Sequence, residues 1–94
     1  MPSVLAEFSV TPMAEGDMRP FVDSALQEIE KAGLKHEVGA VATTVEGELD
    51  QVLDAIKRAH QAALNRGADR VVTDIRIDEK KGGLSMEREI EGYR

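Results

Sequence analysis

The chain has 94 residues, with 12 basic and 18 acidic side chains, a net charge of −6 and no cysteine. This length suffices for one domain with a modest core, and the lack of cysteine excludes disulfides and thiolate metal sites. The acidic balance disfavours nucleic acids and anionic membranes as partners, and with no visible signal peptide or membrane-length apolar run the predicted location is the cytoplasm.

The first two predicted elements are a strand and a helix. Residues 3–11 alternate between two faces, which predicts a β-strand, and Pro12, which has no N–H for a ladder, is expected to end it. Helical spacing of apolar residues then predicts a helix over residues 18–32, with Asp17 as its N-cap and Gly33 as its stop. The apolar face of the strand carries Val4, Ala6, Phe8 and Val10.

The middle of the chain predicts two short strands and a second helix. The strands are expected at residues 36–41 and 43–46, joined by a very tight connection or by a bulge around Ala42. A strong apolar stripe predicts a helix over residues 48–65. Residues 70–78 alternate again and predict the last strand.

The end of the chain is predicted to be a short helical tail. Residues 1–83 are expected to form the domain and residues 84–94 the tail. Met86, Ile90 and Tyr93 lie at helical spacing, but this stripe is too small to fold alone. We therefore expect the tail to dock on a neighbouring subunit.

The order β-α-β-β-α-β predicts an α+β fold, a ferredoxin-like sandwich with a four-stranded antiparallel sheet and two helices on one face. The other face is then left open. Its mixture of apolar and charged residues indicates a sheet-to-sheet oligomer interface. The residues assigned to this open face are Leu5, Glu7, Ser9, Val72, Asp74 and Arg76.

Glu46 stands at the corner between a strand and a helix, beside Thr43 and Thr44. One interpretation is that it flanks the helix N-terminus, where acidic residues are common and slightly stabilising. The other is that its carboxylate accepts hydrogen bonds from, or neutralises, a cationic ligand. The residues alone leave both interpretations open.

Three motifs with consistent spacing are spread over nearly the whole chain, and they resemble those of the thiamine-binding protein family. This family comprises small YkoF-like, ferredoxin-like proteins, many of them uncharacterised. Two positions depart from its pattern: Ala42 replaces a glycine and Arg76 replaces a lysine. The motifs are Glu-x-Ser-x-x-Pro at Glu7, Ser9 and Pro12, the stretch before the second helix at residues 42–47, and the last strand at residues 70–78.

The resemblance implies a non-catalytic protein that binds thiamine or its hydroxymethylpyrimidine part at or near a subunit interface. It also implies a homo-oligomer, with a tetramer built as a dimer of dimers favoured. A carboxylate suits the thiazolium cation or the amino group of thiamine, and hydroxyls suit the edge of the pyrimidine ring. The candidate ligand contacts are Glu7, Ser9, Thr43, Thr44 and Glu46.

Other chemistry finds little support in the sequence. The serines show no nucleophile-elbow pattern, and we expect no enzyme activity, cofactor or metal. His60 lies on the apolar stripe of the second helix, so we expect a half-buried, hydrogen-bonded histidine. The open face lacks the aromatic residues of RNA-binding sheets. The alternative function is a structural or regulatory homo-oligomeric module, similar in logic to ACT domains, that binds no thiamine.

Overall fold

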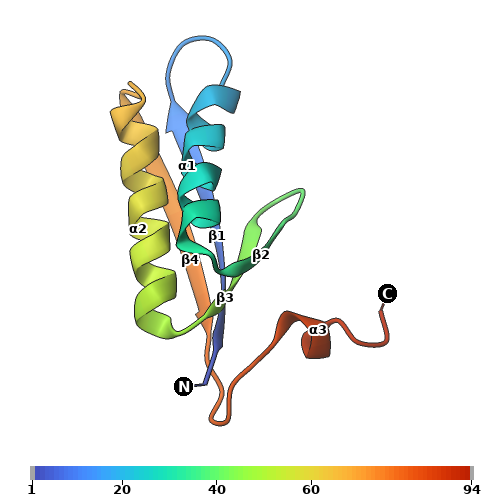
Figure 1. Cartoon of the computed structure of the whole chain (residues 1–94). Helices are drawn as coiled ribbons and strands as arrows, with labels where there is room; N and C mark the ends of the chain where they lie inside the picture. The colour runs from blue at the N-terminus through green and yellow to red at the C-terminus, as the bar shows by residue number, and fades with distance from the viewer. Residues whose placement is uncertain (1, 94) are drawn as a thin grey trace.

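The computed structural model describes residues 2–93, so Met1 and Arg94, the outer ends of the predicted domain and tail, lie outside the described residues. Four strands form one antiparallel sheet in the order β2-β3-β1-β4. Helices α1 and α2 pack side by side on one face of this sheet (Figure 1). The predicted ferredoxin-like fold is confirmed. The elements are β1 (Val4–Met13), α1 (Arg19–Ala32), β2 (Lys35–Val38), β3 (Thr43–Gly47), α2 (Leu49–Asn65), β4 (Arg70–Asp78) and α3 (Met86–Glu89).

The core lies between the sheet and the two long helices. The strand register confirms the predicted faces of β1, because Ala6 sits between Val45 and Ile77 on the helix side. The face with Leu5 and Glu7 is the open one. Burial of the inward side chains is the main favourable term in folding. The largest fully buried side chains are Ile29, Ile56, Val4, Val45 and Val52.

β1 continues through Pro12, so the predicted end of this strand is wrong. Among residues 2–93, only β4 pairs with β1 beyond Phe8, because β3 begins at Thr43, the partner of Phe8. That part of β1 is therefore an edge on its β3 side. An edge tolerates a residue without an N–H, since no neighbouring strand needs the donor.

The hairpin between β2 and β3 also differs from the prediction. Residues 39–42 form a four-residue loop, closed by the Gly39 N–H, which donates to the Ala42 carbonyl at 3.0 Å. The two strands are consequently separated by a real loop, and β2 ends at Val38. The expected tight connection or bulge at Ala42 is wrong.

The ends of α1 follow the sequence in part. Met18 occupies the N-cap position without a side-chain cap, while Asp17 accepts a hydrogen bond from the Arg19 N–H at 3.0 Å. The N-cap is therefore Met18, so the prediction for Asp17 is wrong; Asp17 lies one residue before the cap. At the other end Gly33 has φ 71°, the left-handed conformation that glycine adopts most readily, and it ends the helix as predicted.

The histidine of α2 is structural. His60 Nδ1 lies 2.6 Å from the Thr73 hydroxyl of β4, in a half-buried position. This contact ties α2 to the sheet and confirms the prediction for His60. Among the helices of residues 2–93, none is long and apolar enough to cross a membrane.

Candidate functional site

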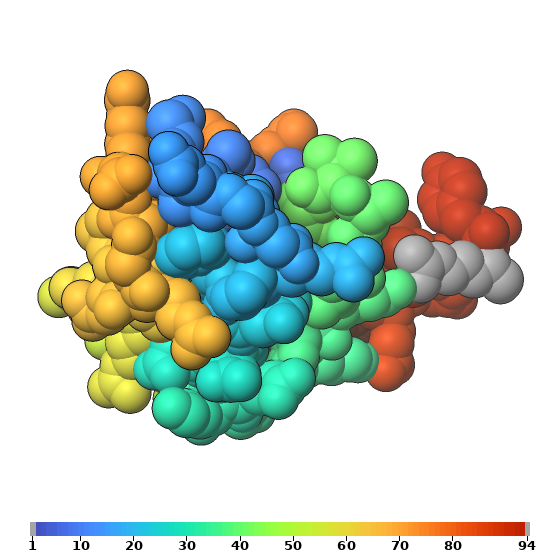
Figure 2. All heavy atoms as spheres, turned by 90° about the horizontal axis from the view of Figure 1, so that it is seen from above, coloured from blue at the N-terminus to red at the C-terminus, as the bar shows by residue number. Residues whose placement is uncertain are grey.

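The C-terminal tail docks on its own sheet. Figure 2 shows it beyond the β2–β3 hairpin, on the side away from α2. The Leu84 N–H donates to the Ser3 carbonyl at 2.9 Å, and Met86 is only 7% exposed. The expectation that this segment needs a neighbouring subunit is therefore wrong for Met86. Tyr93 remains exposed.

Glu46 is engaged by this tail. Its Oε1 accepts the Met86 N–H at 2.7 Å, at the first residue of α3, where backbone donors lack helical partners. The N-cap of α2 is Glu48, and the hydrogen bond of Glu46 goes to the tail and not to that helix start. The carboxylate at the strand-to-helix corner thus fastens a segment 40 residues away in the sequence.

A surface ion pair adds a second tie. Lys35 Nζ lies 2.6 Å from Glu87 Oε1, and both side chains are exposed. This hydrogen bond raises the pKa of Lys35 and lowers the pKa of Glu87. Exposed pairs are weak and are screened by salt, so this tie modulates the docking of the tail.

The pair makes tail docking depend on pH. Because the pKa of Glu87 is lowered, its contribution is present above the ordinary glutamate value of about 4.3 and is lost as pH falls through the lowered value. Because the pKa of Lys35 is raised, its contribution is present below about 10.4 and is lost as pH rises further. We expect the protection factor of the α3 amides, the ratio of the intrinsic exchange rate to the observed one at each pH, to be highest between these limits. A Lys35→Gln variant with the parent's pH profile would contradict this.

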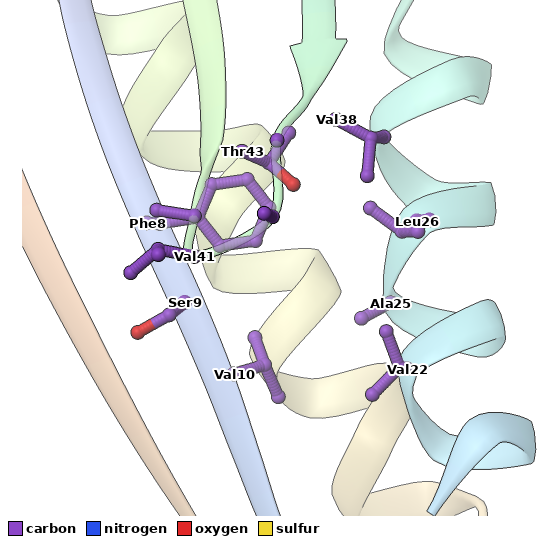
Figure 3. Close-up of a pocket in the computed structure, with 12 residues that line it drawn as sticks. Phe8, Ser9, Val10, Val22, Ala25, Leu26, Val38, Val41 and Thr43 are labelled. Atoms are coloured by element: carbon purple, nitrogen blue, oxygen red, sulfur yellow. The ribbon is translucent and has the colours of Figure 1, made fainter.

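A cleft lies between β1, α1 and the loop of residues 39–42. Its volume is about 190 Å³, and Figure 3 shows the Thr43 hydroxyl pointing into it from β3. Thr43 as a residue is 6% exposed, and its hydroxyl has no hydrogen-bond partner among residues 2–93. No buried side-chain oxygen of these residues is unpaired, so this hydroxyl is accessible from the cleft. An accessible hydroxyl without a protein partner can bind water or a ligand in the cleft. The apolar walls come from Phe8, Val10, Val22, Ala25, Leu26 and Val38.

The strand register explains the place of this cleft. β3 begins at Thr43, which pairs with Phe8, whereas β1 runs on alone past that point on the same side. A gap therefore remains between β1 and the loop. On the open-face side of β1 lies a smaller hollow of about 100 Å³, lined by Glu7, Asp74 and Arg76. The cleft and the hollow share Phe8, Ser9 and Ala42.

The five predicted contacts do not form a single cluster. Glu7 and Thr44 are directly opposed on the open face, and with Arg76 they line a hollow of about 200 Å³. The Ser9 hydroxyl points away from the cleft (Figure 3), whereas Thr43 faces into it. Glu46, the fifth predicted contact, accepts a hydrogen bond from the tail.

The two predicted carboxylates, Glu7 and Glu46, differ in their hydrogen bonding. Glu46 has a hydrogen-bond partner, whereas Glu7 is exposed and has none in the described part of the chain. Glu7 is therefore the carboxylate available to a ligand. The sequence also gave no sign of Val22 and Leu26 as cleft walls, because apolar residues four apart on a helix predict core packing equally well.

The hollows are small for a complete ligand site. Small-molecule sites usually measure about 300–1,000 Å³, whereas the cleft has about 190 Å³. One chain therefore offers room for about a single ring. In the part of the chain that the structure describes, no group of three or more histidine, aspartate or glutamate side chains could hold a metal.

Comparison with known proteins gives a consistent result. The family model of the thiamine-binding proteins matches residues 6–94. A UPF0045 protein of Methanocaldococcus jannaschii is 42% identical over 82 residues, which are 86% of this chain and 81% of the relative. A UPF0045 protein of Clostridium perfringens is 40% identical over 73 residues, 78% of this chain and 77% of the relative.

Two solved structures resemble the whole chain. A domain of unknown function from Bacillus cereus, DUF77, has a TM-score of 0.94 at 40% identity and covers 99% of this chain and 91% of its own. A candidate thiamine biosynthesis or salvage protein of Thermotoga maritima has a TM-score of 0.88 at 34% identity. The match covers 99% of this chain and 100% of the Thermotoga chain. The chain therefore belongs to the thiamine-binding protein family.

Proposed function

We propose that this chain is a non-catalytic, cytoplasmic binding protein for thiamine or its hydroxymethylpyrimidine moiety, with the pyrimidine ring in the cleft. The observation that carries the proposal is the Thr43 hydroxyl, which opens into a cleft with apolar walls (Figure 3) and has no protein partner among residues 2–93. Membership of the thiamine-binding family and the Thermotoga neighbour support the choice of ligand.

The chemistry of the ring suits the cleft. An aminopyrimidine is flat, with two apolar faces and an edge of donors and acceptors. Phe8 and Leu26 offer apolar walls to the faces, and the Thr43 hydroxyl can both donate to and accept from the edge. In the described part of the chain no strand pairs with β1 beyond Phe8 on this side, so backbone groups of β1 are available to the same edge.

The cationic thiazolium needs a different environment. The smaller hollow, which shares Ser9 with the cleft, carries two carboxylates, Glu7 and Asp74, against one guanidinium, Arg76, so its net charge is negative. We place the positive ring there, against the Glu7 carboxylate, with Ser9 at the rim and Thr44 opposite Glu7. Glu46 contributes by holding the tail, because Met86 and Ile90 border a further hollow that includes Thr44.

The ligand is proposed to lie at or near a subunit interface. The hollows on the open face measure about 100 to 270 Å³, less than the usual size of a ligand site, so a second subunit on this face would complete the enclosure. A dimer of dimers provides such contacts and fits the mixed polar and apolar character of the open face. This assembly is part of the proposal.

The alternative is a structural or regulatory oligomeric module without thiamine binding. The exposed Val72 on the open face, beside charged neighbours, favours it, because a semi-polar face is also what a purely structural interface would present. In that case the cleft holds only water.

Calorimetric titration with thiamine, and in parallel with hydroxymethylpyrimidine, tests the proposal. We expect saturable binding at micromolar concentration or tighter, about −8 kcal/mol or better. If the pyrimidine occupies the cleft, hydroxymethylpyrimidine alone should bind, whereas the isolated hydroxyethylthiazole should not. No heat with thiamine or hydroxymethylpyrimidine would reject the ligand and leave the module.

A further inference from the structure

The C-terminal tail encloses a hollow against the open face of its own sheet. This tail hollow has a volume of about 270 Å³ and lies between the strands β1, β2 and β3 and the helix α3. Leu5 and Thr44 line it from the sheet, and Met86 and Ile90 line it from the tail. The cleft and the two hollows beside Glu7 include no residue of the tail. The tail hollow is therefore a separate space.

The lining of the tail hollow is apolar inside and acidic at its mouth. Leu5, Met86 and Ile90 provide the apolar surface. Glu37 and Glu89 also line the hollow, and both are exposed residues, so their carboxylates lie where the hollow meets water. The described residues that line it include no basic side chain. A ligand that matches this lining brings an apolar body and a positive charge.

The tail has the parts of a hinged lid over this hollow. Gly82 and Gly83 stand at its base with φ 93° and 96°, the left-handed region that glycine adopts most readily. Glu46 holds the other end, because its Oε1 accepts the Met86 N–H at 2.7 Å. The helix between them and the chain end has only four residues, too few to be stable without such contacts. Release of Met86 from Glu46 is therefore the step that opens the hollow.

These features point to one class of ligand. We propose that the tail closes over a site for a small organic cation, a primary ammonium group carried by an apolar body of about one ring. The body lies among Leu5, Met86 and Ile90, where its surface leaves water. The ammonium stays at the mouth, where Glu37 and Glu89 accept its hydrogen bonds. Glu46 is a positioning residue of this site, since it holds the tail and does not touch the ligand.

The inference does not rest on thiamine binding. The pyrimidine ring is proposed to lie in the cleft, on the helix side of the sheet, whereas the tail hollow lies on the open face. The two spaces share only Gly39, in the loop between β2 and β3. Hydroxymethylpyrimidine should therefore leave a ligand of the tail hollow in place, and a protein that binds no thiamine could still bind the cation.

A matched pair of probes tests the need for charge. Phenethylamine and phenethyl alcohol share the ring and the chain, and only the amine is positively charged at neutral pH. In an NMR titration we expect phenethylamine to shift the amide resonances of residues 86–90, with a millimolar dissociation constant or tighter for a ligand of its size. The alcohol should bind at least about tenfold more weakly, because it lacks the charge-assisted hydrogen bonds. Equal affinity of the two probes, no shift in α3, or displacement of the amine by hydroxymethylpyrimidine would overturn the proposal.

Variants of Glu89 test the mouth of the hollow. The Glu89 carboxylate has no hydrogen-bond partner among residues 2–93, so Glu89→Gln should leave the fold intact. It should weaken phenethylamine by about tenfold and leave phenethyl alcohol unchanged, because only the charge is lost. Glu91→Gln is the matched control, the same change in the same tail but outside the lining, and it should alter neither affinity. An equal loss in the two variants would overturn the proposal, since it would show only the effect of total charge.

Variants of Glu46 test the lid. Glu46→Ala removes the acceptor of the Met86 N–H and should weaken both probes by about tenfold or more, because the tail no longer encloses them. Glu46→Gln keeps a side-chain oxygen that can accept the same N–H, so its affinities should stay within about threefold of the parent. Parent-like binding of both probes by Glu46→Ala would show that the tail forms no wall of the site and would overturn the proposal.

Discussion

Replacing Thr43 by valine is expected to weaken binding of hydroxymethylpyrimidine by about ten- to a hundredfold, since an unpaired buried polar group costs about 1–3 kcal/mol. Valine keeps the shape and the β-branch that suit a strand, so the fold should persist. The ring edge would then lose its side-chain partner inside an apolar cleft. Calorimetric titration of the variant and the parent measures the ratio of the two dissociation constants.

The control is the next residue of the same strand. Thr44→Val makes the same chemical change, but Thr44 faces the open side of the sheet, opposite Glu7. Its effect on hydroxymethylpyrimidine should be much smaller than that of Thr43→Val, because the ring lies on the other face. If Thr44→Val weakens binding more, the ring binds on the open face and the assignment of the cleft is wrong.

The fold was predictable where the apolar pattern is strict. Residues 70–78 alternate throughout, and β4 spans that same range, with Thr73 and Ile75 on the helix side. The error at Pro12 arose from an assumption about its neighbours. The sequence does not show that β3 begins only at Thr43, the partner of Phe8. Because β3 is this short, the end of β1 beyond Phe8 is an edge.

The candidate site was less predictable, and two residues show why. Thr43 and Thr44 are adjacent, so as strand residues they must point to opposite faces; the strand boundary, set by the loop of residues 39–42, decides which one faces inward. Glu46 was expected to serve α2 or a ligand, but its hydrogen-bond partner is Met86, 40 residues away. Local pattern carries no information on such a contact.

Phe8 joins the core to the cleft, so its removal should have the largest effect on stability. It is 3% exposed, belongs to the main buried cluster and forms a wall of the cleft. Phe8→Ala is expected to lower the free energy of unfolding by about 3–5 kcal/mol, a large part of the roughly 5–15 kcal/mol of a typical domain. Thermal unfolding should show a midpoint at least about 12 °C lower.

Phe21→Ala provides the matched control, because Phe21 is only half-buried and does not line the cleft. It should cost about 1 kcal/mol, near the centre of the range for point mutations, and leave ligand affinity unchanged. Phe8→Leu separates the two roles of Phe8: it retains most of the buried apolar volume, so stability should fall by less than about 2 kcal/mol, while the flat wall against the pyrimidine is lost and affinity drops. Parent-like affinity in Phe8→Leu would show that the ring does not pack against Phe8, and the ligand would then have to be placed outside the cleft.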